Sequence, residues 1–250
     1  MRRLGIALAL VAASTAAQEA RKSGAEFMSE STRAMQRDDT QNPAMLWVAN
    51  GAALWETKAG KADRSCAACH GDAAGMRGVA ARYPAFDRGA GRVITLGERI
   101  NLCRTGKQQA PAFTPESAAL LGLEAHVALQ SRGLPLAPPG DAATRAAAAR
   151  GKELYGQRIG QLNLSCAQCH DDNWGRKLAG ATIPQAHANA YPIYRLEWQG
   201  MGSLQRRLRN CMSGVRAQVP PLAAQELVDL EAWLALRARG MPLETPGVRP

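Results

Sequence analysis

Aromatic side chains are scarce in this chain: three Phe, four Tyr and five Trp make up 5% of its 250 residues. The chain is nevertheless basic, with a formal net charge of +10. Nucleic-acid-binding surfaces combine such charge with interleaved aromatic residues, whereas the arginines here are scattered. We therefore exclude a nucleic-acid surface and expect an anionic small substrate or an acidic protein partner.

Long apolar runs are also missing. Arg2 and Arg3 precede one apolar run, Leu4 to Ala13, and small residues follow through Ala17. This run is shorter than the roughly 20 residues that cross a bilayer, and no later stretch is long enough, so we expect no membrane span. A charged start, a short apolar run and small residues are typical of a secretory signal. We predict a signal peptide over residues 1–17 and a soluble protein in the periplasm.

Histidine is rare too, yet two of the four histidines end the same pentapeptide. The two copies, at an offset of 100 in the numbering, are Cys66-Ala67-Ala68-Cys69-His70 and Cys166-Ala167-Gln168-Cys169-His170. In such a motif both thiols bond covalently to haem and the histidine ligates its iron. We predict two covalently bound haem c groups, attached by Cys66, Cys69, Cys166 and Cys169 and ligated by His70 and His170. The alternatives are a redox dithiol and a zinc site that would need two more ligands.

The sequence repeats itself outside these motifs. At an offset of 100, Leu54, Gly60, Ser65, Asp72, Gly75 and Pro84 match Leu154, Gly160, Ser165, Asp172, Gly175 and Pro184. At offsets of 108 and 107, Thr95 to Gly106 matches Ser203 to Gly214, and Leu123 to Leu136 matches Leu230 to Leu243. Such self-similarity indicates a tandem duplication. We predict an N-terminal extension over 18–45, a first cytochrome c-like haem domain over 46–138 and a second, catalytic one over 139–250.

Helical patterns dominate both units. Leu46 to Ala59 and Ala142 to Arg158 are rich in alanine, which favours helix. Thr114 to Arg132 and Pro221 to Arg239 carry apolar residues at helical spacing and are followed by glycine and proline. Little reads as strand, and the proline-rich run Pro135 to Gly140 is the candidate linker. The fold class we expect is mainly α, with two tandem class I-like cytochrome c domains.

The sixth ligand of each iron separates electron carriers from catalysts. Met76, Met201 and Met212 lie downstream of the motifs, but none has a methionine at the matching position of the other unit. Apart from the attachment motifs, only Cys103 and Cys211 place sulfur equivalently in both units. We therefore predict thiolate ligands, Cys103 for haem 1 and Cys211 for haem 2. A disulfide between them is the alternative that an oxidising compartment would permit.

With these features the chain resembles the SoxA family, the dihaem subunits of SoxAX cytochromes, over nearly all of its length beyond the signal. Cys103 follows His70, and Cys211 follows His170, at the spacing along the chain at which the thiolate ligands of that family follow their motif histidines. The resemblance implies that Cys211 is the catalytic cysteine, with a cysteine persulfide intermediate. It also implies that Arg207, four residues earlier, binds the substrate.

The implied activity is that of an L-cysteine S-thiosulfotransferase. Such an enzyme oxidatively couples thiosulfate to a cysteine thiol of a SoxY-like sulfur-carrier protein and passes two electrons by haem to a soluble cytochrome c. The implied partner is a SoxX-like mono-haem cytochrome in a heterodimer. The competing functions are a periplasmic dihaem electron carrier without a substrate site and a dihaem peroxidase, which needs an open distal position.

The arginines near Cys211 have competing roles. Arg207 and Cys211 are one helical turn apart and would share a helix face. A fixed guanidinium fork suits the sulfonate oxygens of thiosulfate, whereas the alternative for Arg207, and for the similarly spaced Arg99, is an ion pair with a haem propionate. For Arg206 and Arg209 we expect a solvated basic helix face, with steering of anions as the alternative.

Overall fold

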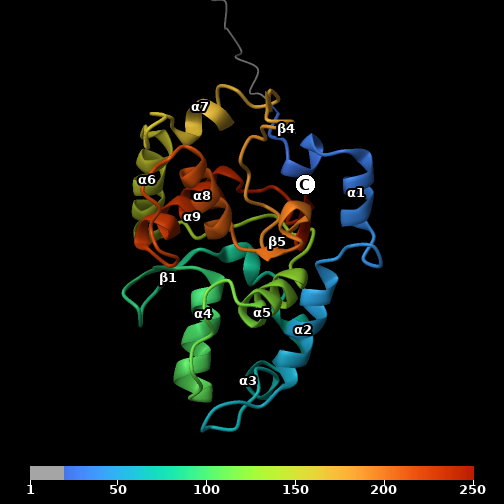
Figure 1. Cartoon of the computed structure of the whole chain (residues 1–250). Coiled ribbons are helices and arrows are strands. Elements are labelled where there is room, and N and C mark those ends of the chain that lie inside the picture. The colour runs from blue at the N-terminus through green and yellow to red at the C-terminus, as the bar shows by residue number, and fades with distance from the viewer. Residues whose placement is uncertain (1–19) are drawn as a thin grey trace, which may run out of the picture.

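The computed structural model describes residues 20–250, so the predicted signal peptide over 1–17 lies outside the described residues. Figure 1 shows two helical units, the first from blue to green and the second from yellow to red. An N-terminal segment precedes them, with the turn η1 (Gly24–Phe27) and helix α1 (Glu30–Arg37). Among residues 20–250, no helix combines the length and the apolar character that crossing a membrane requires.

The two units share the same order of main helices and one hairpin, and differ in the short elements between them. The first consists of α2 (Met45–Glu56), α3 (Ala67–His70), η2 (Ala73–Met76), η3 (Ala80–Arg82), β1 (Ala85–Asp87), β2 (Arg92–Ile94), α4 (Leu96–Cys103), the π-helical turn η4 (Arg104–Gln108) and α5 (Ala118–Leu129). The second consists of α6 (Ala142–Gly156), α7 (Cys166–His170), β3 (Lys177–Leu178), β4 (Ala181–Thr182), β5 (Ile193–Arg195), η5 (Leu196–Trp198), β6 (Gly200–Gly202), α8 (Leu204–Gly214), α9 (Gln225–Arg237) and β7 (Gly247–Arg249). The mainly α, duplicated architecture is therefore confirmed.

The predicted helices lie close to their expected positions, with one systematic difference. Helices α5 and α9 begin a few residues later than the apolar pattern predicts. Glu116 and Ala223, which occupy matching positions of the repeat, both have a φ of 64°, in the left-handed region that does not continue a helix. In the first unit the Ser117 side chain then caps the start of α5 by accepting a hydrogen bond from the Leu120 amide.

In each unit the first and last helices cross at a glycine. A Cβ on Gly51 of α2 would lie 2.0 Å from the carbonyl oxygen of Gly122 in α5. A Cβ on Gly151 of α6 would lie 1.9 Å from the carbonyl oxygen of Asp229 in α9. Only hydrogen fits at so close an approach of two backbones. Gly51 and Gly151 are matched by the repeat, so the duplication has kept this crossing point.

The strand hairpins pack reciprocally on the helices of the other unit. Val93 of β2, in the first unit, joins a buried cluster with Ala147 of α6 and Val228 of α9. Tyr194 of β5, in the second unit, joins a buried cluster with Val48 of α2 and other residues of α2 and α5. Each unit thus supplies part of the other unit's hydrophobic core, which holds the two units in one arrangement.

The predicted linker pairs with the end of the second unit. Pro135 and Pro242 form an antiparallel bridge. The amide of Leu136 donates to the carbonyl oxygen of Met241 at 2.9 Å. The amide of Gly240 donates to the carbonyl oxygen of Leu136 at 2.8 Å. Leu136 and Met241 are buried in one apolar cluster. The linker is therefore part of the contact between the units.

The segment before α2 packs on the second unit, although it precedes the first in the chain. Gln36 accepts a hydrogen bond from the amide of Val248 in β7 at 2.9 Å, and Asn42 donates to the carbonyl oxygen of Pro246 at 3.1 Å. Near its start, the amide of Lys22 donates to Gln185 at 2.7 Å. Figure 1 shows α1 beside the C-terminal end of the chain. The predicted N-terminal extension therefore packs against the second unit.

Candidate functional site

Both Cys-x-x-Cys-His motifs start a short helix that a serine caps. In the second unit, Ser165 and Gln168 form a capping box, in which the Ser165 side chain accepts from the Gln168 amide at 3.2 Å and the Gln168 side chain accepts from the Ser165 amide at 2.9 Å. In the first unit, Ser65 accepts from the amide of Ala68 at 3.0 Å. Each cap starts the helical turn at the first cysteine, so both cysteines and the histidine are presented on one short helix.

The motif histidine of the second unit is oriented by its backbone surroundings. Nδ1 of His170 lies 2.7 Å from the carbonyl oxygen of Pro184. A carbonyl only accepts, so Nδ1 is the protonated nitrogen and Nε2 has its lone pair available for a metal. Between residues 20 and 250, His70 has no such side-chain bond, and its ring lies 5.8 Å from that of Trp55. The second unit therefore holds its histidine in a more fixed orientation.

A cluster of apolar side chains, called the first pocket below, packs against the start of the first motif at Cys66 and Ala67. Its buried residues are Trp55, Leu123 and Val127, and the partly buried ones packed against them are Leu54, Cys66, Ala67, Ala73, Met76, Val79, Leu96, Ile100 and Phe113. Burial, and then the neighbouring charge of Cys103, raise the pKa of the Cys66 thiol. Helix α4 therefore brings Cys103 near Cys66 of the motif.

The second unit has the matching pocket around Cys166. Its buried residues are Tyr155, Leu204, Leu230 and Leu234, with Leu154, Cys166, Ala167, Ala186, Ala188, Tyr191, Leu208, Met212 and Trp233 packed against them. A cavity of about 300 Å³ is lined by Leu154, Cys166, Met212 and Leu230 among others. Burial, and then the charge of Cys211, raise the pKa of Cys166 to about 11 and also raise that of Cys169. Helix α8 therefore places Cys211 near both attachment cysteines.

The residues of both pockets fit a covalently bound haem. Each pocket combines two motif thiols, one imidazole and an apolar lining, which suits the faces of a porphyrin. Each also holds a buried ring nitrogen without a hydrogen-bond partner within 20–250, Nδ1 of His126 in the first unit and Nε1 of Trp233 in the second. These two residues are matched by the repeat, and polar atoms in that position suit a ligand with polar edge groups.

The other sulfur and imidazole candidates differ in position. Met76 and Met212 belong to the apolar linings of the two pockets, whereas Met201 is buried in the cluster between β6 and helices α2 and α5. His187 is half-buried, and this burial, then the charges of Arg237 and Arg21, lower its pKa to about 4. The matched pair of sulfur atoms that faces both motifs is still Cys103 and Cys211.

Two of the alternatives, the disulfide and the zinc site, can be compared with the part of the chain that the structure describes. All six cysteines are free, and the charge of Cys103 acts on Cys66 whereas that of Cys211 acts on Cys166, so Cys103 and Cys211 are not joined in a disulfide. Over residues 20–250, no group of three or more His, Cys, Asp or Glu side chains is arranged to hold a metal ion. The zinc interpretation therefore has no ligand set there.

Arg207 lies beside the motif of the second unit. Its charge contributes to lowering the pKa of His170 and opposes the effect of burial on Tyr191, whose pKa rises to about 12 mainly because the phenol is buried. No carboxylate pairs with Arg207 among residues 20–250, whereas the matched Arg99 forms an ion pair with Asp87. The two arginines thus occupy equivalent positions in different electrostatic surroundings.

One match proposed from the sequence is wrong. The dipeptides Tyr83-Pro84 and Tyr191-Pro192 both lead into the first strand of a hairpin, β1 or β5, and the two hairpins have the same register, so Pro84 corresponds to Pro192. Pro184 instead accepts the hydrogen bond of His170. The difference arises because the second unit has an additional small hairpin, β3–β4, between its motif and the Tyr-Pro step.

Sequence reasoning missed two residues next to Cys211. Tyr191 is close enough for the charges of Arg207 and Cys211 to affect its pKa. Arg195, at the end of β5, is affected by the same two charges. A signal for Tyr191 existed in the Tyr-Pro dipeptide, which occurs once in each unit, at Tyr83 and at Tyr191. Arg195 gives no signal at the repeat offset of 100, because this part of the two units matches at an offset of 108.

Two helical units, each with a Cys-x-x-Cys-His motif in an apolar pocket, define a c-type cytochrome with tandem cytochrome c domains. The family model "SoxA/TsdA, cytochrome c domain" matches residues 50–136 and 150–243. The chain belongs to the SoxA family, as its motifs predicted, and carries covalently bound haem c.

Individual relatives agree with this assignment. The chain is 38% identical over 229 residues to the L-cysteine S-thiosulfotransferase subunit SoxA of Pseudaminobacter salicylatoxidans, covering 91% of this chain and 80% of that protein. It is 34% identical to the SoxA subunit of Rhodovulum sulfidophilum, with the same coverage of 91% and 80%. The crystal structure of SoxXA from P. pantotrophus contains a chain that superimposes with a TM-score of 0.89 at 33% identity, covering 92% of this chain and 87% of that one.

Proposed function

We propose that this chain is the haem-bearing subunit of a periplasmic L-cysteine S-thiosulfotransferase. It would couple thiosulfate to a cysteine thiol of a SoxY-like sulfur-carrier protein. The observation that carries the proposal is the placement of Cys211 and Arg207 on one helix, α8, next to the motif over 166–170. The relatives named L-cysteine S-thiosulfotransferase subunit SoxA support the reaction class.

The two pockets support two haem c groups with one set of roles each. In the first unit Cys66 and Cys69 would attach the haem covalently, and His70 and Cys103 would ligate its iron. In the second unit Cys166 and Cys169 would attach the haem covalently, and His170 and Cys211 would ligate its iron. When bound, haem supplies one-electron transfer to an external cytochrome acceptor.

Arg207 would bind and orient the substrate. Thiosulfate is a small dianion, and a guanidinium fork can donate paired hydrogen bonds to two of its sulfonate oxygens. Among residues 20–250, Arg207 forms no ion pair with an acidic side chain, and a haem propionate is the alternative partner to thiosulfate. Since Cys211 is one helical turn further on, the terminal sulfur of a bound thiosulfate would face the cysteine sulfur.

Cys211 would be the sulfur nucleophile, as a thiolate or a persulfide. A sulfur–sulfur bond forms between Cys211 and the terminal sulfur of thiosulfate, with the loss of two electrons to the cytochrome acceptor. The carrier thiolate then attacks that sulfur, the bond to Cys211 breaks, and the Cys211 thiolate is regenerated. In sum, a carrier thiol and thiosulfate give a cysteine S-thiosulfonate, one proton and two electrons.

The proposal includes partners. A SoxX-like mono-haem cytochrome would form a heterodimer with this chain, supported by the similarity to a chain of a SoxXA complex. Electrons would leave to a soluble cytochrome c. We infer export to the periplasm from the signal predicted over residues 1–17. The two haem-attachment motifs agree with the oxidising conditions of that compartment.

The test is a coupled assay with the holoprotein and its mono-haem partner. The mixture contains thiosulfate, the carrier protein and oxidised cytochrome c, and the readouts are cytochrome reduction and the intact mass of the carrier. We expect the wild type to form the carrier adduct and Cys211→Ala to form none while both haems stay covalently attached. Ser213→Ala, an exposed position on α8, is the matched control and should behave as wild type.

Two results would count against the proposal. If Cys211→Ala forms the adduct at the wild-type rate, Cys211 takes no part in the chemistry. If the wild type with all partners forms no adduct but still exchanges electrons with cytochrome c, the chain is a plain electron carrier.

A further inference from the structure

The hairpins that precede α4 and α8 have the same register. In the first, Ala85 pairs with Ile94 and Asp87 with Arg92; in the second, Ile193 pairs with Gly202 and Arg195 with Gly200. Asp87 thus ends the first strand of one hairpin as Arg195 ends that of the other. Arg99 and Arg207 are related by the same offset in the numbering as these strands. Asp87 therefore corresponds to Arg195 in the way that Arg99 corresponds to Arg207.

This pair of positions carries opposite charge combinations in the two units. In the first, the Asp87 carboxylate forms an ion pair with Arg99. In the second, a guanidinium stands at the position of that carboxylate. The shared register puts Arg195 at the position from which Asp87 reaches Arg99, so its guanidinium lies near that of Arg207. Burial, and then the charge of Arg207, lower the pKa of Arg195. The charge of Cys211 reaches Arg195 as well.

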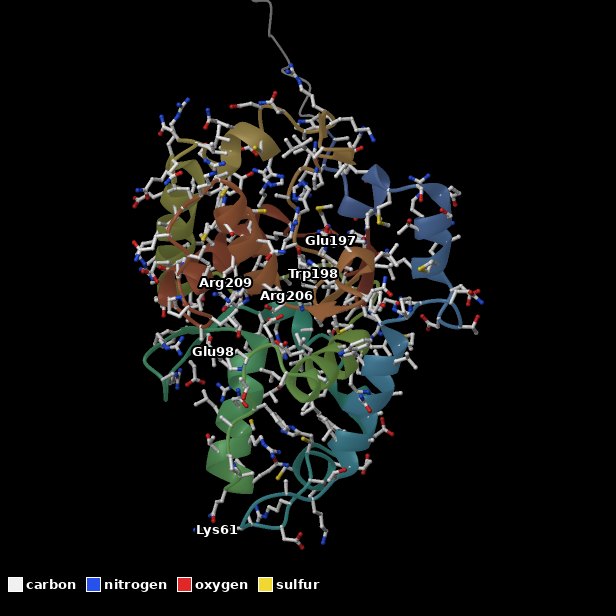
Figure 2. All side chains as sticks on the ribbon, viewed as in Figure 1. Lys61, Glu98, Glu197, Trp198, Arg206 and Arg209 are labelled. Atoms are coloured by element: carbon white, nitrogen blue, oxygen red, sulfur yellow. The ribbon has the colours of Figure 1, made fainter. Side chains whose placement is uncertain are left out.

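Arg195 is held in place rather than mobile on the surface. Its side chain is 13% exposed. Its guanidinium lies 5.2 Å from the ring centre of Trp198, and that of Arg206 lies 4.1 Å from the same ring. Figure 2 shows Trp198 beside Arg206 on the face where Arg209 also lies. A fixed guanidinium loses little side-chain entropy when it binds a ligand.

The positive charge of this pair is only partly balanced. Glu197 forms an ion pair with Nε of Arg195 at 2.8 Å, but the Glu197 side chain is 49% exposed, so solvent screens its charge. Two neighbouring, partly buried cations disfavour each other, and a bound dianion would offset this cost. The first unit has no such need because its matched pair is neutral overall.

We propose that Arg195 is a second substrate-binding residue, which together with Arg207 holds the oxygen end of a sulfur oxo-dianion against Cys211. The inference rests on the proposed function and adds a determinant of specificity for doubly charged anions. A monoanion would offset less of the positive charge of the two guanidinium groups, so it would bind more weakly.

A different role for Arg195 is to balance the charge of Cys211 or of the haem acid groups. In that case its replacement would shift the haem reduction potentials and leave thiosulfate affinity unchanged. Measuring both quantities on the same variants separates the two roles.

The experiment compares four variants of the holoprotein in complex with its mono-haem partner. Arg195→Gln removes the charge, Arg195→Asp recreates the acid–arginine pair of the first unit, Arg207→Gln is the comparator, and Arg209→Gln removes a charge from α8 outside the pair. Thiosulfate binding is measured calorimetrically without carrier or acceptor, KM and kcat in the coupled assay, and haem potentials by redox titration. Visible absorption spectra check that each variant is folded and loaded with haem.

We expect Arg195→Gln to weaken thiosulfate binding and raise KM by about 10- to 100-fold, the effect of one lost charge-assisted interaction, with kcat changed much less. Arg195→Asp should weaken binding further, because the new carboxylate occupies Arg207. Arg209→Gln should bind like wild type. The inference is overturned if Arg195→Gln binds thiosulfate like wild type, or shifts only the haem potentials, while Arg207→Gln raises KM. If the wild type neither binds thiosulfate nor turns it over, the proposed function fails and the inference with it.

Discussion

At the scale of single residues, Arg99 and Arg207 show how one duplicated position has taken on two roles. Both lie four residues before the cysteine that faces a motif, on α4 and α8. Arg99 is neutralised by Asp87, whereas Arg207 has no carboxylate partner among residues 20–250 and has Arg195 as a neighbour. The charge excess thus lies in the second unit, next to Cys211.

Replacing each arginine by glutamine should separate these roles. Arg207→Gln is expected to raise the KM for thiosulfate by about 10- to 100-fold, because one charge-assisted interaction with the anion is lost. Arg99→Gln should leave KM unchanged and lower the free energy of unfolding by at most about 1 kcal/mol, since the pair that it breaks is partly exposed. Steady-state kinetics and urea unfolding give both numbers. Equal effects of the two substitutions on KM would contradict the assignment.

Much of the candidate site could be predicted from the sequence at this scale. The motif cysteines and histidines follow a spacing that haem chemistry dictates, and Cys103 and Cys211 followed from the repeat. The role of Arg195 could not be predicted, because it depends on which residue occupies the matching position of the first unit. Asp87 is recognised as its counterpart only when the hairpin register is known.

At the scale of helices and strands, the crossings of α2 with α5 and of α6 with α9 fix the frame of each pocket. Gly151 brings α6 against the backbone of Asp229, and Arg150 next to it donates to both carboxylate oxygens of that residue, at 2.6 and 2.8 Å. The Asp229 side chain is buried, so the ion pair of Arg150 with Asp229 fixes where α6 lies along the axis of α9. The pocket around Cys166 depends on that frame.

Gly151→Ala should therefore destabilise the protein strongly. Its Cβ would lie 1.9 Å from a carbonyl oxygen, so the two helices would have to separate, at a cost of about 3 kcal/mol. Gly156→Ala is the matched control on the same helix. A Cβ there meets nothing within 4 Å, so alanine should stabilise the protein by about 0.4–1 kcal/mol. Thermal unfolding of both holoproteins measures the difference, and similar melting temperatures would refute the role of Gly151.

The long helices were predictable, and the strands were not. Alanine-rich and amphipathic segments of 12 to 15 residues gave α2, α5, α6 and α9 close to their bounds. The strands are two or three residues long, too short for an alternating pattern to be visible. They matter because each hairpin packs on the helices of the other unit. The small hairpin β3–β4 also accounts for the change of the repeat offset from 100 to 108.

At the scale of the whole molecule, a cavity of about 410 Å³ lies between the units and is lined by acidic residues of both. Glu124 of α5 and Glu231 of α9, matched by the repeat, both face it. Burial, and then the charge of Glu231, raise the pKa of Glu124 to about 8. Burial likewise raises the pKa of Glu231 to about 8, and Gln205 only partly opposes this. Glu98 and Glu116 add negative charge around both groups.

These carboxyls should make stability depend on pH. Their ordinary value is 4.5, so between about pH 4.5 and 8 the folded protein holds more protons than the unfolded chain, and the free energy of unfolding falls as the pH rises through this window. The double variant Glu124→Gln, Glu231→Gln cannot ionise. It should flatten this dependence and stabilise the protein by about 1–3 kcal/mol near pH 8.

Urea unfolding at several pH values from about 5 to about 9 checks this expectation. Glu153→Gln, an exposed position on α6, is the control and should keep the wild-type slope. A slope that is the same in the double variant and in the wild type would show that the two carboxyls titrate normally in the folded protein.

The arrangement of the units was beyond sequence reasoning, although their number was within it. A repeat reveals two copies of one unit, but the reciprocal packing of hairpins and the pairing of Pro135 with Pro242 depend on tertiary contacts. The N-terminal segment had no counterpart in the repeat, so no pattern indicated that it packs on β7. The domain boundaries at 46–138 and 139–250 stay a prediction, since the hydrophobic cores cross them.

The most direct test of the central claim is electron paramagnetic resonance of the purified ferric holoprotein, compared with its Cys103→Ala and Cys211→Ala variants. We expect two low-spin haem signals with histidine and thiolate ligation in the wild type, one of which disappears in each variant. If both signals instead showed histidine with methionine or with a second histidine, and survived both substitutions, sulfur from Cys103 and Cys211 would not be bound to iron.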